Sequence, residues 1–396
     1  GVTPEIILTI TALCILSLEM IRFSRASINS LISFLGLLMA GSVILNGTGN
    51  PGTLFGGMLE LNYFSIFFDL LYLAIGLVTI IFSQRYLEKK GTECPGEYPA
   101  LILFSVIGMM LMTRANDLVI LFLGLELLSL SLYVLVGFLY HNQLSNEASL
   151  KYLLLGAFST GFFLFGAALT YGATGTTNYN EIALAVSSKS ILSNIYLSLG
   201  IGLLLIGFAF KVALVPFHMW SPDVYQGAPT PITGFLCTAP KAAGFGALIK
   251  LFITAFPEVY PDWQNLFWIL AAITMSVGNI SALMQSNVKR MLAFSSVSHA
   301  GYILLGVLVY NWIGISAVLF YFVVYSVMNL GAFSIVAIVE KEDTGITFKD
   351  YRGLATKHPW LAIFMAIFMI SLAGFPPTAG FIAKYGLLSA AVDKGF

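Results

Sequence analysis

Residues 211–252 have the sequence KVALVPFHMWSPDVYQGAPTPITGFLCTAPKAAGFGALIKLF, which carries the clearest signal of the architecture. An apolar run ends here in a proline-rich segment, and a second apolar run follows it. The prolines of the segment are Pro216, Pro222, Pro229 and Pro231. Because proline removes a backbone donor and clashes with the preceding turn, we expect the first helix to open near Pro216. The stretch therefore predicts a broken helix followed by a second apolar helix, with a lysine inside each.

The composition of the whole chain places these helices in a membrane. Of 396 residues, 58% are hydrophobic and 10% are charged, against about 45–50% and about 25% in soluble globular proteins. The 19 basic and 19 acidic residues cancel, so there is no overall basic field to attract nucleic acid. We predict an all-α polytopic membrane protein.

Apolar runs long enough to cross a bilayer recur along the chain. A helix needs about 20 mainly apolar residues to span about 30 Å of hydrocarbon. Twelve candidate spans result: 5–21, 28–45, 61–82, 99–113, 117–139, 149–172, 194–217, 231–256, 264–284, 291–310, 313–339 and 359–390. We divide them into an N-terminal three-helix segment (1–98), a unit of helices 4–8 (99–256) and a unit that starts at helix 9 (264–396).

The seventh and the twelfth spans are both interrupted. In the twelfth, SLAGFPPTAGF places Gly374, Pro376 and Pro377 in the middle of the span. Each broken span is the fourth helix of its unit, and each break lies beside a lysine. Discontinuous helices at matching positions of two halves are typical of transporters built from inverted repeats. The predicted fold therefore has at least 12 transmembrane helices, two inverted five-helix repeats, and discontinuous helices 7 and 12.

Basic residues are distributed unevenly between the two sides of the membrane. Connections after odd-numbered helices hold eleven: Arg22, Arg25, Arg85, Lys89, Lys90, Lys289, Arg290, Lys341, Lys349, Arg352 and Lys357. Connections after even-numbered helices hold four: Arg114, Lys189, Lys250 and Lys394. Because basic residues favour the cytoplasmic side, we predict that the N-terminus lies on the outer side.

Six ionisable side chains lie inside the predicted spans: Glu126, Lys151, Lys211, Lys241, His299 and Lys384. A lysine at mid-bilayer costs about 2.5–3.5 kcal/mol on insertion scales. Lys241 follows Pro231 in a continuous helix, which places it about 15 Å deep at about 1.5 Å per residue. Three central lysines face one central glutamate, so ion pairing does not account for all of them. A buried lysine can release and accept a proton near neutral pH, so the set indicates a proton relay.

Simpler structural interpretations stay open for each residue. Lys151 lies near the start of its helix and could reach the membrane interface. His299 could be a neutral, hydrogen-bonded core side chain, and Asp69, early in the third span, could be a structural hydrogen-bonding partner. The central charges could form ion pairs, although buried ion pairs stabilise less than apolar packing does.

Five stretches resemble the antiporter-like proton-pumping subunits of respiratory complex I. The first is 216–252, and the others are DLVILFLGLELLSLSLYVLVG around Glu126, EASLKYLLLGAFSTG around Lys151, QSNVKRMLAFSSVSHAGY around His299 and SLAGFPPTAGFIAKY around Lys384. Within this family, DVYQGAPTP followed by TAPKAAGF is similar to the subunit N group, called subunit 2 in mitochondria. The resemblance covers essentially the whole chain.

This resemblance implies roles for the first three buried charges. Glu126 would be the key glutamate, and Lys211 would be its partner and would hold the proton. Lys151 would lie near that pair and modulate it. The resemblance also implies fourteen helices, so helices 13 and 14 would complete the second repeat.

The remaining three residues would continue the path. By the same resemblance, Lys241 would be the central connecting lysine and His299 would lie on the hydrated axis. Lys384 would be the last relay group, towards the outer face. Protons would enter from the cytoplasmic side into helices 4–8 and leave on the outer side.

Redox cofactors are expected on other chains. Cys14, Cys94 and Cys237 form no metal or haem spacing, and no dinucleotide or phosphate-binding glycine motif occurs. FMN, iron–sulfur clusters and quinone would belong to partner subunits. The implied partners are the other membrane-arm subunits, including the paralogous antiporter-like ones, then indirectly the peripheral redox arm, and the lipid bilayer.

The sequence thus predicts a proton-translocating membrane-arm subunit of NADH:quinone oxidoreductase in a bacterial plasma membrane or its organellar equivalent. A subunit of a multi-subunit Na⁺/H⁺ antiporter is the first alternative, but carboxylates at depth are few, chiefly Glu126 and Asp69. A non-conducting scaffold is the second alternative. The set of one glutamate and three lysines argues against it, since a scaffold could carry leucine at each position.

Overall fold

The computed structural model describes residues 1–21, 26–47, 51–92, 94–187, 194–340 and 345–396. The long helices are α1 (Thr3–Met20), α2 (Ala26–Gly47), α3 (Tyr63–Lys89), α4 (Glu97–Arg114), α5 (Leu118–Val136), α6 (Gln143–Thr174), α8 (Ile195–Lys211), α10 (Thr230–Ala255), α11 (Tyr260–Leu283), α12 (Val288–Leu308), α13 (Trp312–Val339), α15 (Pro359–Ala373) and α16 (Ala379–Asp393). The short helices are α7 (Tyr179–Ser187), α9 (Trp220–Gly227), α14 (Leu354–Lys357), and the 3₁₀ turns η2 (Pro257–Val259) and η3 (Phe348–Tyr351). Strands β1 (Gly52–Leu54) and β2 (Leu59–Leu61) form an antiparallel hairpin.

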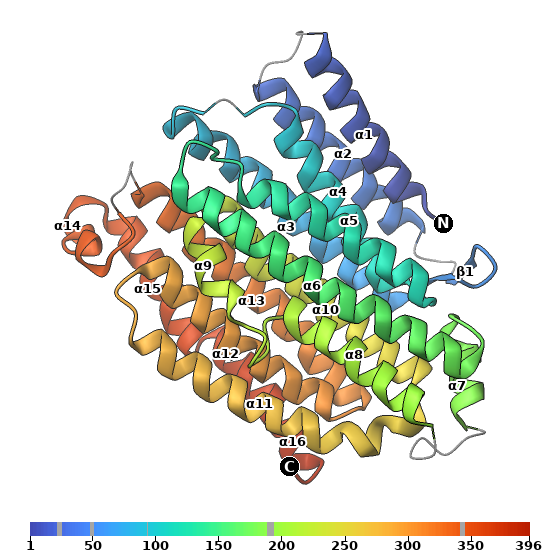
Figure 1. Cartoon of the computed structure of the whole chain (residues 1–396). Coiled ribbons are helices and arrows are strands. Elements are labelled where there is room, and N and C mark those ends of the chain that lie inside the picture. Colours follow the sequence, from blue (N-terminus) through green and yellow to red (C-terminus); the bar gives the residue numbers. More distant parts are fainter. Residues whose placement is uncertain (22–25, 48–50, 93, 188–193, 341–344) are drawn as a thin grey trace.

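These helices match the twelve predicted spans. Ten helices of the described residues are long and apolar enough to cross a membrane. The seventh and twelfth spans are the broken pairs α8–α9 and α15–α16, which lie within the bundle in Figure 1. The polytopic all-α fold is therefore confirmed, while the three-segment division, the inverted repeats and the orientation stay predictions. Four residues used for the orientation lie outside the described part of the chain: Arg22, Arg25, Lys189 and Lys341.

Helix α10 forms the centre of the bundle, between the N-terminal helices and the α11–α16 side (Figure 1). It packs against α3, α4 and α13, and every residue from Thr230 to Phe252 is buried. Small residues permit this burial, because a Cβ atom at Gly246 would lie 2.9 Å from the Thr113 side chain. A lysine in the middle of α10 is therefore surrounded by protein on all sides.

Both predicted helix breaks are present. In the first, α8 ends, Ala213 adopts a φ of 60°, and a cis peptide bond precedes Pro216 before α9 begins. In the second, Gly374 adopts a φ of 80° at the end of α15, and a cis peptide bond precedes Pro377 before α16 begins. The proline-rich segments thus divide each span into two helices, as the sequence predicted.

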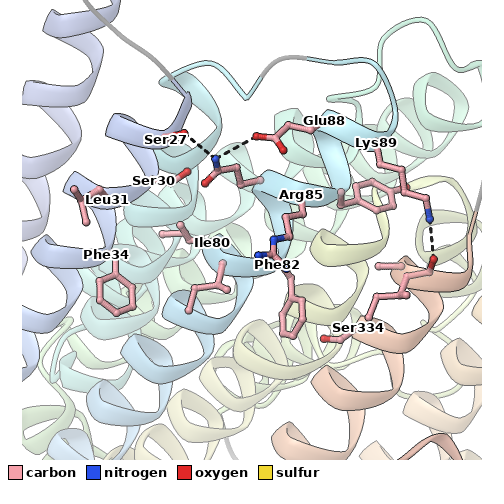
Figure 2. Close-up of a pocket in the computed structure, with 15 residues that line it drawn as sticks. Ser27, Ser30, Leu31, Phe34, Ile80, Phe82, Arg85, Glu88, Lys89 and Ser334 are labelled. Atoms are coloured by element: carbon pink, nitrogen blue, oxygen red, sulfur yellow. Dashed lines mark hydrogen bonds between the residues drawn. The ribbon is translucent and has the colours of Figure 1, made fainter. Parts of the chain in front are cut away.

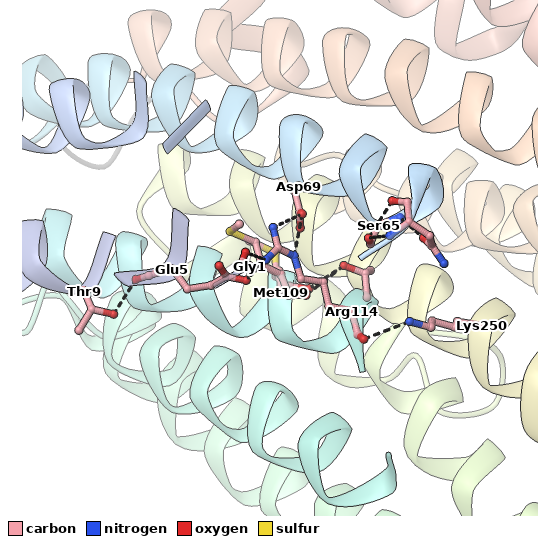
Figure 3. Close-up of polar contacts among 11 residues, drawn as sticks. Gly1, Glu5, Thr9, Ser65, Asp69, Met109, Arg114 and Lys250 are labelled. Carbon is pink, nitrogen blue, oxygen red and sulfur yellow. Dashed lines mark hydrogen bonds and ion pairs between the residues drawn. The ribbon is translucent and has the colours of Figure 1, made fainter. Parts of the chain in front are cut away.

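Three basic residues that we assigned to connections are instead buried, and this corrects the sequence analysis. Lys289 donates to the Ala228 carbonyl at 2.7 Å, while Arg114 and Lys250 lie together in a cluster of charges. Arg114 lies 2.6 Å from Asp69 and 2.5 Å from Glu5 (Figure 3), and Lys250 lies 3.3 Å from Glu60. The Lys250 ammonium also donates to the Arg114 carbonyl at 3.0 Å. We call these five residues the Arg114 cluster. The cluster (Glu5, Glu60, Asp69, Arg114 and Lys250) therefore joins the end of α4 and the last turns of α10 to carboxylates from α1, α3 and β2.

Candidate proton-relay site

The six predicted site residues come from six helices of the bundle. Glu126 lies on α5, Lys151 on α6, Lys211 on α8, Lys241 on α10, His299 on α12 and Lys384 on α16. The structure places five of them in two separate polar regions: Glu126 and Lys211 in the first, and Lys241, His299 and Lys384 in the second. Lys151 lies apart from both.

The first polar region surrounds Lys211, the last residue of α8. This lysine is buried, and its Nζ donates to the Ser129 hydroxyl at 2.9 Å. Ser129 lies one helical turn after Glu126 on α5, and Oε1 of Glu126 is buried without a hydrogen-bond partner among the described residues. Within the described chain, no ion pair joins Glu126 to Lys211. The pair implied by the resemblance is therefore open in this structure, with the lysine held by a neutral hydroxyl.

A small cavity lies beside this lysine, between α5, α6 and α8. Its volume is about 10 Å³, and its lining includes Ser129, Ser159, Thr160 and Lys211. A space of this size is about the smallest that holds one water molecule, and the hydroxyl groups supply the polar partners that such a water needs. The hydroxyl residues were missed from the sequence, although Ser129 follows Glu126 at the spacing that shares a helix face.

Lys151 belongs to a different environment. Its side chain is 41% exposed, and its Nζ lies 2.7 Å from Asp223 on α9 and 2.7 Å from Glu147. Arg290 on α12 also binds Asp223, at 2.6 Å. Lys151 therefore ties α6 to the second half of the broken helix, and its relay role stays a prediction.

The second polar region starts at Lys241, in the middle of α10. Its Nζ donates to the Ser296 carbonyl at 2.7 Å and to the Ser296 hydroxyl at 2.5 Å. The Tyr325 hydroxyl on α13 donates to the same Ser296 hydroxyl at 2.9 Å. All three residues are buried. A lysine, a serine and a tyrosine from three helices are thus in continuous hydrogen-bond contact at the centre of the bundle.

His299 lies one turn after Ser296 on α12 and extends this region. Its Nδ1 is hydrogen-bonded to the Tyr321 hydroxyl, and its ring lies 5.1 Å from the Tyr325 ring, measured between centroids. Tyr321 and Tyr325 lie one turn apart on α13, so they present their rings to the same face. The alternative of a hydrogen-bonded core histidine fits this geometry as well as a relay role does.

Lys384 lies at the other end of the region, at the second helix break. Its Nζ donates to the Leu372 carbonyl at 2.8 Å and to the Ala373 carbonyl at 3.2 Å. These carbonyls end α15, where no following turn supplies donors, so the lysine caps the helix. The ammonium also lies 4.7 Å from the centroid of the Tyr302 ring, which is 6.1 Å from the His299 ring.

Together these contacts form what we call the central polar row: Lys241, Ser296, Tyr325, Tyr321, His299, Tyr302 and Lys384. Sequence reasoning predicted the two lysines and the histidine but missed the serine and the three tyrosines. The chain has 18 tyrosines. In the sequence, the three of the row differ from the others in their spacing: Tyr302 lies one turn after His299, and Tyr321 and Tyr325 lie one turn apart. His218, in the segment that joins α8 to α9, has a buried Nδ1 without a hydrogen-bond partner among the described residues.

Comparison with known proteins agrees with this fold. Residues 115–396 match the family model described as NADH:quinone oxidoreductase/Mrp antiporter, TM. The broken helices, the buried lysines and this match define an antiporter-like membrane subunit. A relative from Trichlorobacter lovleyi, an NADH-quinone oxidoreductase subunit N, is 47% identical over 398 residues, covering 100% of this chain and 81% of the relative. The chain belongs to the subunit N family of NADH-quinone oxidoreductase.

Solved structures give the same result. A chain of respiratory complex I from Thermus thermophilus with bound aureothin is 34% identical, with a TM-score of 0.85, over 100% of this chain and 84% of that one. A chain of the Mrp complex from Dietzia has a TM-score of 0.85 over 99% of this chain and 74% of that one. Its identity is 22%, so this second likeness shows the fold alone.

Proposed function

We propose that this chain translocates protons as a membrane-arm subunit of NADH:quinone oxidoreductase, driven by quinone reduction on partner subunits. The single observation that supports this most is the central polar row, in which two lysines and a histidine are linked through hydroxyl groups and aromatic rings inside an apolar bundle. Nothing in apolar packing requires such a row. The subunit N name of the relatives supports the assignment to this complex.

In this proposal, Lys211 holds a proton in the first half of the chain. Its ammonium is bound to the neutral Ser129 hydroxyl, and the Glu126 carboxylate lies one turn away on the same helix. A move of the ammonium from Ser129 to Glu126 would stabilise the protonated lysine, and the reverse move would favour proton release. The pair therefore acts as a switch, and the open arrangement is its releasing state.

The second half passes the proton along the central polar row. Lys241 donates to Ser296, whose hydroxyl also accepts from Tyr325, so donor and acceptor roles can exchange along this contact. His299 can accept on one ring nitrogen and donate from the other, which is what a relay group requires. Lys384 would receive the proton last and release it on the outer side.

The same proposal specifies the cofactors, the partner subunits and the membrane in which the chain would function. FMN, iron–sulfur clusters and quinone would be bound by partner subunits, and the neighbouring partners would include paralogous antiporter-like subunits. The chain would lie in the bacterial plasma membrane with its N-terminus on the outer side. An Na⁺/H⁺ antiporter subunit is the remaining alternative, and its support is the shared fold of the Mrp chain.

Proton pumping by a Lys211→Ala variant tests this function. The assembled complex would be reconstituted in liposomes, and proton uptake would be measured per NADH oxidised. We expect pumping through this chain to be lost, because alanine cannot hold the proton beside Glu126. Lys357→Ala, at an exposed lysine of α14, serves as the control. Full pumping by a normally assembled Lys211→Ala complex would overturn the proposal.

A further inference from the structure

A large groove lies between α2, α3 and α13, away from the proton-relay site (Figure 2). Its volume is about 740 Å³. One end is polar, with side chains from the last turns of α3 and the first turns of α2: Ser27, Ser30, Gln84, Arg85, Glu88 and Lys89. The rest of the lining is mainly apolar, including Leu31, Phe34 and Phe82. The groove thus has a polar rim above an apolar body.

A second groove continues from the first along α3, α13 and α15. Its volume is about 520 Å³, and nearly all of its lining residues are apolar, such as Leu71, Val327 and Phe368. The two grooves share Phe82, Ser334 and Ile338. They therefore form one continuous surface depression with its polar end at the helix termini and its apolar end towards the middle of the helices.

The charge at the polar rim is mainly positive. Arg85 is exposed, points into the groove in Figure 2, and has no hydrogen bond or ion pair within the described part of the chain. Lys89 donates to the Ile338 and Glu340 carbonyls at 2.7 and 2.6 Å, which fastens the end of α3 to the end of α13. Glu88 is bound to Gln84 at 3.2 Å on the rim. A guanidinium in this position lacks the anion that its five donors favour.

We propose that this continuous groove binds one anionic phospholipid, with the phosphodiester at Arg85 and an acyl chain along α3 and α13. The polar rim of the groove matches a phospholipid headgroup at the membrane surface, and its apolar body matches an acyl chain in the hydrocarbon layer. Phosphate oxygens match the planar fork of an arginine, and basic pockets between membrane helices bind anionic headgroups. An apolar helix of a partner subunit would fill the groove but would leave the guanidinium without an anion.

Photo-labelling of the assembled complex tests this site. The complex would be placed in nanodiscs that contain phosphatidylglycerol or phosphatidylcholine with a photoreactive acyl chain. After irradiation, labelled peptides covering 71–89 and 323–338 would be measured by mass spectrometry. For one basic residue at the headgroup, we expect the phosphatidylglycerol probe to label these peptides about five-fold more than the phosphatidylcholine probe.

Substitutions at the rim separate this site from general membrane contact. Arg85→Glu should remove the preference for phosphatidylglycerol, and Arg85→Lys should retain most of it. Arg352→Glu, at an exposed arginine outside the groove, should leave it unchanged. If Arg85→Glu does not assemble, Ser334→Trp, which blocks the junction of the two grooves, should reduce labelling by both probes.

Three results would overturn the proposal. The first is equal labelling by both probes in the unsubstituted complex, and the second is a preference that survives Arg85→Glu. The third is protection of both peptides from either probe together with cross-links to a partner subunit, which would show that a protein covers the groove. None of these results bears on proton pumping, so the site and the proposed function are tested separately.

Discussion

The Arg114 cluster and the central polar row bury charge in opposite ways. In the cluster, carboxylates lie 2.6 Å and 2.5 Å from the guanidinium of Arg114, so each charge has an opposite charge beside it. In the row, the hydrogen bonds that Lys241 and Lys384 donate in the described part of the chain go to hydroxyl and carbonyl oxygens. Helix α10 contributes a lysine to each region, Lys250 to the cluster and Lys241 to the row.

Under the proposed function, this difference separates the buried charges that stabilise the fold from those that transfer protons. A carboxylate partner stabilises the charged form of a basic group and holds its proton in place. A hydroxyl or carbonyl oxygen can bind the charged or the neutral amine, so it leaves the proton free to move. Depth in the membrane alone does not distinguish the two kinds of site. The partner atoms do.

The largest expected effect comes from the Arg114 cluster. Asp69→Asn removes a charge from a fully buried pair, so we expect it to destabilise the assembled complex by about 3 kcal/mol. Asp262→Asn, the same change at an exposed position of α11, should cost less than about 0.5 kcal/mol. The temperature at which the purified complex dissociates would measure both. Equal temperatures for the two variants would contradict a structural role for the cluster.

An intermediate effect is expected in the central polar row. Tyr325→Phe removes the hydroxyl that binds Ser296, and one hydrogen bond of this kind corresponds to about a two- to ten-fold change in rate. We therefore expect slower proton pumping by a complex that assembles normally. Tyr385→Phe, at an exposed tyrosine of α16, is the matched control. If pumping by Tyr325→Phe equals that of the control, the hydroxyl is not part of the relay.

The smallest effect is expected at Lys151. Because exposed ion pairs contribute about 0.2–1 kcal/mol, Lys151→Ala should slow pumping by about five-fold or less. Arg290 would still bind Asp223 and hold α9 in place. Glu147→Gln, which removes the other partner of Lys151, should have a similarly small effect. A pumping loss of about ten-fold or more in Lys151→Ala would instead place this lysine directly in the relay.

Much of the fold was predictable because its signals are local in the sequence. Each membrane helix needs a long apolar run, and each break needs proline or glycine within it, so spans and breaks follow from short windows. The burial of Arg114 and Lys250 was not predictable in this way. Arg114 lies one residue beyond the predicted fourth span and Lys250 lies in the last turns of the eighth, and the carboxylates beside them come from segments far away in the chain.

The site was predictable where a charge interrupts an apolar run. Glu126, Lys211, Lys241 and Lys384 meet that condition, and the structure places each on the helix expected. The partners of these residues could not be predicted, because Ser296, Tyr321 and Tyr325 resemble the other hydroxyl residues of the apolar helices. Only the packing of α12 against α13 distinguishes them.

Two lysines of the same helix test whether the central polar row, and not the Arg114 cluster, transfers protons. Lys241 and Lys250 are both buried on α10, but Lys241 binds Ser296 and Lys250 lies 3.3 Å from Glu60. The measurement is the number of protons pumped per electron by reconstituted complexes with Lys241→Met or Lys250→Met. We expect fewer protons per electron from the Lys241→Met complex. For the fraction of the Lys250→Met complex that assembles, we expect the number to be unchanged. The same number for both variants would contradict this expectation.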